Sequence, residues 1–417
     1  MLALHTSDWH LGRALHGHRL GDAQAAFVDH LVSVVRAESV DVVLVSGDVH
    51  DRALPPVEAM KLFDEALGRL RDAGAAIVVI SGNHDAPARL GDKSGLLDPR
   101  VTIRTDPARV AEPVIIEDEH GPVAIYAIPY LEPAAVRDLL PADDGSDEGR
   151  GLGSTDPEPS DPASTNSRTA DPETTKPQSA GQERADQDGV RVASHAAVLG
   201  RAMTAVTADR GRRGGRSIVL AHAWVTGGAA SESEREIGGL GGVGNVPAGL
   251  FDGVTYTALG HLHRPQSIGR SLRYSGSPLP YSFSEADDTK SSWLVELDAT
   301  GLGWVEAIPV PVYRRLSAVR GRLDDLMTNE RYATNEADFV AVTLTDAERP
   351  ADAMTAVQRR FPHALRLDFA PDRPDRAADR TYAELVHSLG DQQIAEAFVA
   401  HVRTAPHGGE RELLAEA

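Results

Sequence analysis

Five short polar motifs in this 417-residue sequence carry side chains that bind divalent metal ions in proteins. They read SDWH, SGDVHD, GNHD, LAHAW and GHLH, and each follows a short apolar run. Carboxylate and amide oxygens combined with imidazole nitrogens suit Mn²⁺, Fe²⁺ or Zn²⁺. The sequence has no cysteine, so thiolate ligands are excluded and a structural zinc site is disfavoured. The candidate residues are Asp8, His10, Asp48, Asn83, His84, Asp85, His222, His261 and His263.

The spacing of these residues favours one shared pocket. Within SDWH and GHLH the candidate ligands are two residues apart, and residues i and i+2 of an extended chain point to the same side. Glycine precedes the polar residues of three motifs, at Gly47, Gly82 and Gly260, where it permits a sharp turn. One such motif alone is also typical of a turn. Together they predict two ions bridged by a carboxylate, a centre that clamps the attacking and leaving oxygens of a phosphoryl displacement.

The elements that position these motifs alternate between strand and helix patterns. The apolar runs LALHT, DVVLVS, AIVVIS and SIVLAH each end at a motif and predict strands, whose carboxyl ends form sites in open α/β sheets. Segments 26–40 and 57–74 have helical period. In the second, Val57, Met60, Phe63, Leu67 and Leu70 recur at three- and four-residue spacing and predict one buried face. Further strand patterns at 254–259, 271–275 and 293–298 predict a second sheet packed on the first.

Composition divides the chain into three parts, which are expected at 1–309, 310–375 and 376–417. Within the first part, residues 141–190 contain twelve acidic and four basic side chains and no aromatic residue, which predicts a disordered acidic insertion. Residues 310–375 alternate strand and helix patterns and predict a small α/β domain. Residues 376–417 have the apolar spacing of one or two amphipathic helices.

The overall composition limits the class of protein. With 41% hydrophobic and 25% charged residues it is globular, and no apolar run reaches the roughly 20 residues that cross a membrane. The start MLALHTSDWHLG lacks the pattern of a secretory signal, so we expect a cytoplasmic protein. A net charge of −20 argues against a free-standing nucleic-acid binder. Two divalent ions would nevertheless attract a phosphodiester locally, so DNA remains a possible substrate.

The type and order of the five motifs resemble those of the calcineurin-like metallophosphoesterases. More narrowly, HTSDWHLGR, SGDVHDR, SGNHD, ALGHLHRPQ and YSGSPLPYSFSEADDTKS are similar to the SbcD family of nuclease subunits. This similarity covers about residues 1–310 apart from the insertion. The resemblance implies an α/β fold with two packed mixed sheets flanked by helices. It also implies that 310–375 is a cap domain and that 376–417 forms helices that dock an ATPase partner.

The resemblance implies a role for each candidate residue. One ion would be held by Asp8, His10, Asp48 and His263, and the second by Asp48, Asn83, His222 and His261, with Asp48 as the bridge. His84 would contact the scissile phosphate and protonate the leaving oxygen without binding metal. Asp85 would orient the His84 ring, and Asp51 would support the ligands from outside.

The activity implied is hydrolysis of DNA by two divalent ions, with Mn²⁺ favoured. It includes 3′ to 5′ degradation of duplex ends and endonucleolytic cleavage of single strands or hairpins. A protein with this activity is expected to associate with the nucleoid. The implied partners are DNA, an SbcC-type coiled-coil ATPase and a second copy of the chain within a heterotetramer. The chain has no Gly-x-x-x-x-Gly-Lys loop, which agrees with a partner binding ATP. Two alternatives stay open: another calcineurin-like phosphoesterase, such as a protein phosphatase or cyclic-nucleotide phosphodiesterase, and a non-enzymatic scaffold.

Overall fold

The computed structural model describes residues 1–92, 94–136, 184–185, 191–192, 194–234, 244–371, 390–402, 410 and 413–414. The chain forms two compact units. The first contains Met1–Ala14 and Arg19–Pro311, and the second contains Leu15–His18 and Val312–Ala417. The predicted disordered insertion lies almost wholly outside the described residues. At its end, the short strands β9 (Arg184–Ala185) and β10 (Arg191–Val192) pair antiparallel.

Among the described residues, the first unit contains two mixed sheets of six strands each. In spatial order, the first consists of β16 (Gly301–Pro309), β15 (Ser291–Asp298), β1 (Leu2–Thr6), β4 (Val42–Ser46), β5 (Ala76–Ile80) and β6 (Val101–Arg104). The second consists of β13 (Gln266–Ile268), β14 (Leu272–Tyr274), β12 (Tyr256–Gly260), β11 (Arg216–His222), β8 (Gly121–Ala127) and β7 (Val114–Asp118). In the first sheet, β1, β4, β5 and β6 pair parallel, and the antiparallel pairs lie at the β16 edge. In the second sheet, β14, β12, β11 and β8 pair parallel, with one antiparallel pair at each edge.

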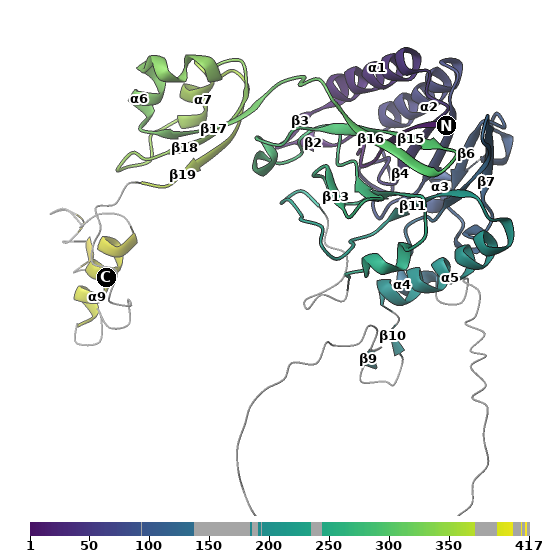
Figure 1. The fold of residues 1–417 in the computed structure, drawn as a ribbon. Coiled ribbons are helices and arrows are strands. Elements are labelled where there is room, and N and C mark those ends of the chain that lie inside the picture. The colour runs from purple at the N-terminus through teal and green to yellow at the C-terminus, as the bar shows by residue number, and fades with distance from the viewer. Residues whose placement is uncertain are drawn as a thin grey trace, which may run out of the picture. The chain divides into compact units, whose positions relative to one another are not determined.

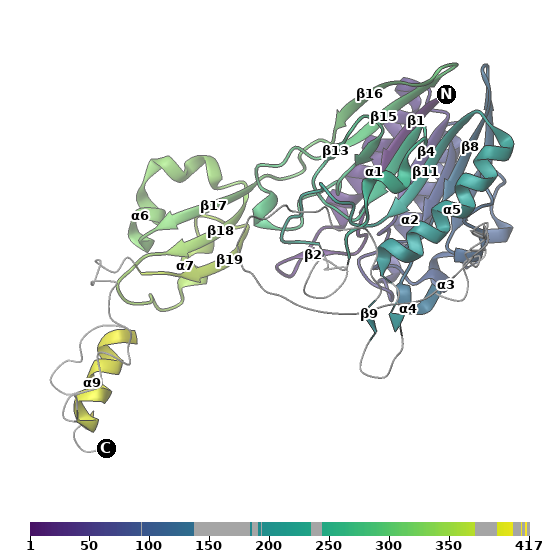
Figure 2. The same ribbon diagram turned by 60° about the horizontal axis from the view of Figure 1, so that its bottom comes forward.

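Helices cover the outer faces of these two sheets (Figures 1 and 2). The helices of the first unit are α1 (Gly21–Glu38), α2 (Val57–Asp72), α3 (Pro87–Leu90), α4 (Pro133–Val136) and α5 (His195–Arg213). One apolar cluster joins α1 and α2 to the first sheet, and another joins α5 to the second. A third cluster lies between the sheets. The predicted fold, two packed mixed sheets flanked by helices, is confirmed.

The alternation of side chains along β4 shows why its sequence is apolar throughout. Successive residues of a strand point to opposite faces of the sheet. Val43 and Val45 therefore pack with the helices, and Val42 and Leu44 pack between the sheets. All four side chains are fully buried. A strand covered on both faces needs an apolar run, which is the pattern observed.

Helix α2 departs from the prediction in its first turn. Phe63, Leu67 and Leu70 are buried as expected. Val57 and Met60, predicted to share that buried face, are instead 60% and 36% exposed. Periodicity identifies the face of a helix, but it does not show how far along the helix the covering layer extends.

The second unit contains one three-stranded parallel sheet among its described residues. Its strands are β17 (Leu316–Gly321), β18 (Phe339–Leu344) and β19 (Ala364–Phe369), and its helices include α6 (Leu323–Thr328), α7 (Ala353–Gln358) and α9 (Asp391–Val402). Much of the predicted C-terminal helical region, 376–417, lies outside the described residues, namely 376–389, 403–409, 411–412 and 415–417. Over the part of the chain that the structure describes, no helix combines the length and apolar character of a membrane span.

Arg216, Asp118 and the Met1 ammonium form an ion-pair network in the first unit. Its contribution to stability can be measured. Arg216, 7% exposed, bonds both carboxylate oxygens of Asp118, which also accepts a bond of 2.7 Å from the Met1 ammonium. Asp118→Asn leaves Arg216 buried without its counter-ion, so we expect the free energy of unfolding to fall by about 3 kcal/mol. Urea denaturation at neutral pH measures this change.

The pH dependence gives a second readout for the same substitution. Arg216 and the Met1 ammonium hold the pKa of Asp118 well below its usual value. A lowered folded pKa stabilises the protein above the unfolded pKa, about 3.9, and this stabilisation is lost as pH falls below it. The difference between wild type and Asp118→Asn should therefore be constant from about pH 5 to 8 and shrink under stronger acid. A difference that stays constant down to about pH 2 would contradict this.

Candidate metal centre

The candidate residues converge from the carboxyl ends of five strands in two sheets. Asp8 and His10 follow β1, Asp48 follows β4, and Asn83 follows β5, all in the first sheet. His222 ends β11, and His261 and His263 follow β12 in the second sheet. Backbone bonds of 3.0 Å from Asp8 N to Gly47 O and 2.9 Å from His10 N to Asp48 O hold the first two loops together.

The backbone at this point is held in conformations that side chains disfavour. Asp8, His10, Asp48 and His261 have φ values of +53°, +44°, +48° and +104°. Such values are uncommon outside glycine and concentrate at functional sites. Four of the seven such non-glycine residues in the described part of the chain belong to the candidate set. The fold therefore maintains local strain where the motifs meet.

Glycine at position 260 is required by the close approach of the two sheets. A Cβ on Gly260 would lie 1.8 Å from the Ser46 carbonyl oxygen and 2.9 Å from His222 Nδ1. Backbone atoms this close cannot move aside. Gly260 thus lets β12 approach β4 closely, which brings the ligands of the second sheet to those of the first.

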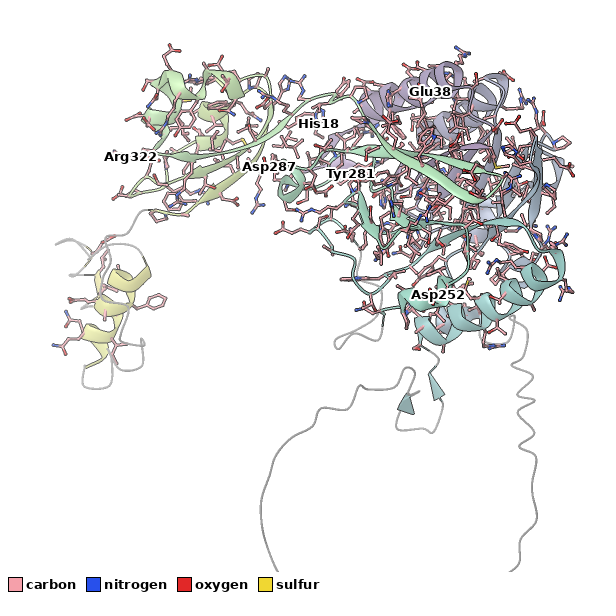
Figure 3. The ribbon with its side chains drawn as sticks, viewed as in Figure 1. His18, Glu38, Asp252, Tyr281, Asp287 and Arg322 are labelled. Atoms are coloured by element: carbon pink, nitrogen blue, oxygen red, sulfur yellow. The ribbon has the colours of Figure 1, made fainter. Side chains whose placement is uncertain are left out.

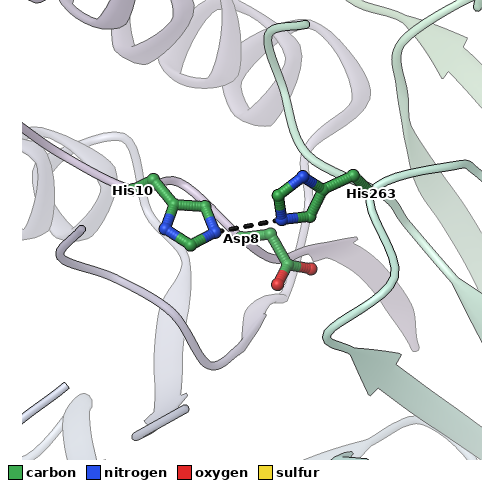
Figure 4. Close-up of side chains that lie close together, drawn as sticks. All are labelled: Asp8, His10 and His263. Carbon is green, nitrogen blue, oxygen red and sulfur yellow. Dashed lines mark hydrogen bonds between the residues drawn. The ribbon is translucent and has the colours of Figure 1, made fainter. Parts of the chain in front are cut away.

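One group of candidate ligands consists of Asp8, His10 and His263 (Figure 4). Their ligand atoms lie within 4.8 Å of one another, and the three side chains are buried. The Nε2 atoms of His10 and His263 face each other at 3.1 Å. His10 Nε2 also lies 3.6 Å from Asp48 Oδ2, so Asp48 borders this group.

A second group surrounds the other side of Asp48. His222 Nδ1 donates to the Ser46 carbonyl at 2.9 Å, which directs Nε2 to Asn83 Oδ1 at 2.9 Å and Asp48 Oδ2 at 3.4 Å. The His261 ring lies 5.4 Å from that of His222. Asp48 therefore lies between the two groups of ligands.

Burial and charge shift the pKa values of these residues in opposite directions. Burial raises the pKa of Asp8 to about 6, partly offset by His222 and His263. Burial also acts to raise the pKa of Asp48, but His222 and His10 bring it well below its usual value. Burial acts to lower the pKa of His222, but Asp48 raises it to about 9. Burial lowers the pKa of His10 and His261 well below the usual value, which leaves their rings neutral.

These groups fit divalent ions by the chemistry of their donor atoms. His261 Nε2 is buried and has no hydrogen-bond partner among the described residues. Because His222 Nδ1 donates to Ser46, its Nε2 is the ring nitrogen that faces the oxygens of Asn83 and Asp48. Lone pairs that converge in a buried space are stabilised by a cation. The structure therefore provides clusters of His and Asp that suit metal ions.

His84 lies beside the centre with its ring orientation fixed. Its backbone N–H donates to Asp48 Oδ1 at 2.9 Å, and its ring Nδ1 donates to the Asp51 carbonyl at 2.7 Å. The side chain is half-buried, and a ring nitrogen lies within 4.8 Å of ligand atoms of His10 and Asp48. The geometry alone is compatible with contact to a substrate or to an ion.

Asp85, predicted to orient the His84 ring, bonds backbone groups of two loops with its carboxylate. Its carboxylate accepts backbone N–H bonds of 3.0, 2.9 and 2.9 Å from Val49, His50 and Gly82. It therefore ties the loop after β4 to the loop after β5, while the carbonyl of Asp51 binds the His84 ring. The side chain of Asp51 lies 3.6 Å from His10 Nδ1 and pairs with Arg13, so it does support a candidate ligand from outside.

Sequence reasoning missed the residues that surround His263. Ser233 and Glu285 contact its ring side, and Lys290 bonds its carbonyl oxygen. Burial acts to raise the pKa of Glu285, but His263 and Lys290 lower it to about 2. Tyr281, labelled in Figure 3, lies edge-on to the rings of His10 and His263. Three of these residues fall within YSGSPLPYSFSEADDTKS, so a motif was visible although their contacts were not.

Comparison with known proteins adds two family matches. Residues 1–145 match the model for calcineurin-like phosphoesterases. Residues 312–403 match the SbcD model described as the type 5 capsule protein repressor C-terminal domain. The second match begins where the second unit begins, at Val312. A solved protein from Thermus thermophilus, TT1561, matches 74% of this chain and 99% of its own length, at 14% identity and a TM-score of 0.37.

The calcineurin-like phosphoesterase match indicates a metal-dependent hydrolase, in agreement with the clusters of His and Asp at the strand ends. The matched range contains Asp8, His10, Asp48 and Asn83, and the histidines of β11 and the β12 loop lie beyond it in the second sheet. The two matches, a calcineurin-like phosphoesterase domain followed by an SbcD C-terminal domain, together support an SbcD-type nuclease subunit.

Proposed function

We propose that this protein is the nuclease subunit of a DNA end-processing complex and hydrolyses DNA phosphodiesters with two divalent ions, Mn²⁺ in preference. The observation that carries the proposal is the position of Asp48 between two groups of ligands drawn from two sheets. One ion would be held by Asp8, His10, Asp48 and His263, and the other by Asp48, Asn83, His222 and His261.

When bound, the two ions would supply an activated water and neutralise charge on the phosphate. The residues of the chain contribute orientation and proton transfer. The bond from His84 Nδ1 to the Asp51 carbonyl leaves Nε2 as the ring nitrogen that can meet a substrate. A protonated Nε2 would deliver its proton to the 3′ oxygen as that oxygen leaves. No side chain needs to form a covalent bond to phosphorus.

The activities we assign are 3′ to 5′ degradation of duplex ends and endonucleolytic cleavage of single strands and hairpins. The SbcD C-terminal match supports an association with an SbcC-type coiled-coil ATPase and with DNA. Leu54, Val57 and Met60 are exposed beside the start of α2 and support self-association as a homodimer within a heterotetramer.

The test is digestion of end-labelled linear duplex DNA by the purified protein with Mn²⁺, with a phosphopeptide as the second substrate. We expect the DNA to be shortened from its 3′ ends and the phosphopeptide to be untouched. Chelation of the metal should stop digestion and added Mn²⁺ should restore it. Hydrolysis of the phosphopeptide with intact DNA would reject the nuclease and favour a phosphatase of the same superfamily. Loss of neither substrate would favour a non-enzymatic scaffold.

A further inference from the structure

His263 is held at each of its backbone polar atoms and at one ring nitrogen. Its N–H donates to Glu234 Oε1 at 2.7 Å, and its carbonyl accepts a bond of 2.9 Å from Lys290 Nζ. Its ring Nδ1 lies 2.5 Å from Ser233 Oγ. The other ring nitrogen, Nε2, faces His10 in the candidate metal centre. The surroundings therefore determine where the ring points.

The direction of the hydrogen bond between Ser233 and His263 follows from the other partner of Ser233, which is Glu285. Ser233 has one hydroxyl proton, and Glu285 Oε1 lies 2.5 Å from its oxygen. Glu285 is 1% exposed and pairs with the Lys290 ammonium at 2.5 Å, so it is an anion and can only accept. The carboxylate takes the proton of Ser233, because charge-assisted bonds are the stronger ones. Ser233 must then accept from His263, whose Nδ1 carries the ring proton.

We propose that Lys290, Glu285 and Ser233 form a hydrogen-bonded relay that sets the tautomer of His263, with the proton on Nδ1 and the lone pair of Nε2 directed at the metal centre. The inference rests on the proposed function, in which His263 is a ligand. These are positioning residues, since none of them reaches the centre itself. Outer partners of this kind typically change metal affinity 10- to 100-fold.

The substitution Glu285→Gln reverses the direction of the hydrogen bonds from residue 285 through Ser233 to His263, while the side chain at position 285 keeps nearly the same size. Lys290 is a donor only, so the amide oxygen of Gln stays with Lys290 and the NH₂ group turns to Ser233. Ser233 then accepts from that group and gives its own proton to His263 Nδ1. The ring proton moves to Nε2, which faces the centre and can no longer bind an ion. We therefore expect Glu285→Gln to lower the affinity for one ion by at least as much as Ser233→Ala does. Ser233→Ala only removes the hydrogen bond that holds the His263 ring.

Calorimetric titration of the metal-free protein with Mn²⁺ tests the relay without using activity. We expect two ions in wild type and about tenfold weaker binding of one of them in Ser233→Ala. Ser233→Thr keeps the hydroxyl and should restore the affinity. Asp287→Asn is the matched control, because Asp287 is an exposed carboxylate of the same segment, labelled in Figure 3. Its affinity should equal that of wild type.

The tautomer is read directly by long-range ¹⁵N–¹H NMR on metal-free protein labelled at histidine. His263 should carry its proton on Nδ1 in wild type and on Nε2 in Glu285→Gln. Folded variants with wild-type Mn²⁺ affinity and an unchanged tautomer would overturn the relay. If Glu285→Gln does not fold, the comparison of Ser233→Ala with Ser233→Thr decides whether the relay exists, since both of these variants keep the bond between Glu285 and Lys290. Wild type that binds no Mn²⁺ would reject the proposed function, while the NMR result would still decide the relay.

Discussion

Asp48→Asn should reduce hydrolysis of phosphodiesters by at least about a thousandfold. The carboxylate of Asp48 lies between His10 and His222, at 3.6 and 3.4 Å, and is the shared ligand of both proposed ions. An amide in its place has one neutral donor oxygen and cannot bridge two cations. The amide oxygen can still accept the N–H of His84, so the loop after β5 should keep its place. The measurement is the rate of digestion of duplex DNA at saturating Mn²⁺.

The control for this substitution is Asp64→Asn, which makes the same chemical change on the exposed side of α2. Its digestion rate should match that of wild type. Circular dichroism and thermal unfolding then establish that Asp48→Asn is folded. A folded Asp48→Asn protein with more than about a tenth of the wild-type rate would show that Asp48 does not bridge the ions.

His84→Ala should lower kcat on DNA by about 10²- to 10³-fold while both ions still bind. The ring of His84 is bonded to the Asp51 carbonyl, and the contact with Asp48 is made by the backbone N–H, which alanine retains. If the ring protonates the leaving oxygen, the loss of rate in His84→Ala depends on the basicity of that oxygen, because a more basic leaving group requires protonation to depart. We therefore expect a much smaller loss with bis-p-nitrophenyl phosphate, whose leaving group departs as a stable anion.

The control for this ring deletion is His120→Ala in the exposed turn between β7 and β8, which should change neither rate. Mn²⁺ titration separates the two roles that the geometry of His84 allows. Loss of one ion in His84→Ala would identify His84 as a ligand. An equal loss of rate on DNA and on the p-nitrophenyl ester would exclude it as the proton donor.

Much of the fold was predictable because the local pattern of apolar residues in each strand reflects whether one or both of its faces are buried. The apolar runs before Asp8, Asp48 and Asn83 are buried on both faces, and each ends at the same edge of the first sheet. Glycine at 260 could be recognised as a point of close approach, although the sequence does not say what approaches it. The antiparallel strand β7 was not predicted, because its alternating burial is weaker than the apolar runs.

The supporting contacts were not predictable because they join distant segments. Ser233 meets Glu285 across 52 positions, and no local pattern marks Ser233 as a partner of His263. The backbone contacts of Asp85 were not predictable for a related reason. Adjacency in sequence suggested that it contacts the His84 ring, but a loop places neighbouring side chains on different partners, and Asp85 bonds backbone groups of the β4 loop.

The position of β1 in the first sheet has a consequence for biosynthesis. This strand is made before both of its neighbours: it pairs on one side with β4 and on the other with β15, Leu2 lying opposite Glu296. A chain emerging from the ribosome therefore keeps one edge of β1 unpaired until almost 300 further residues have been made. His261 and His263 also emerge late. An unfinished chain thus lacks the assembled centre, so the proposed cleavage activity would arise only after these late segments of the first unit have been synthesised.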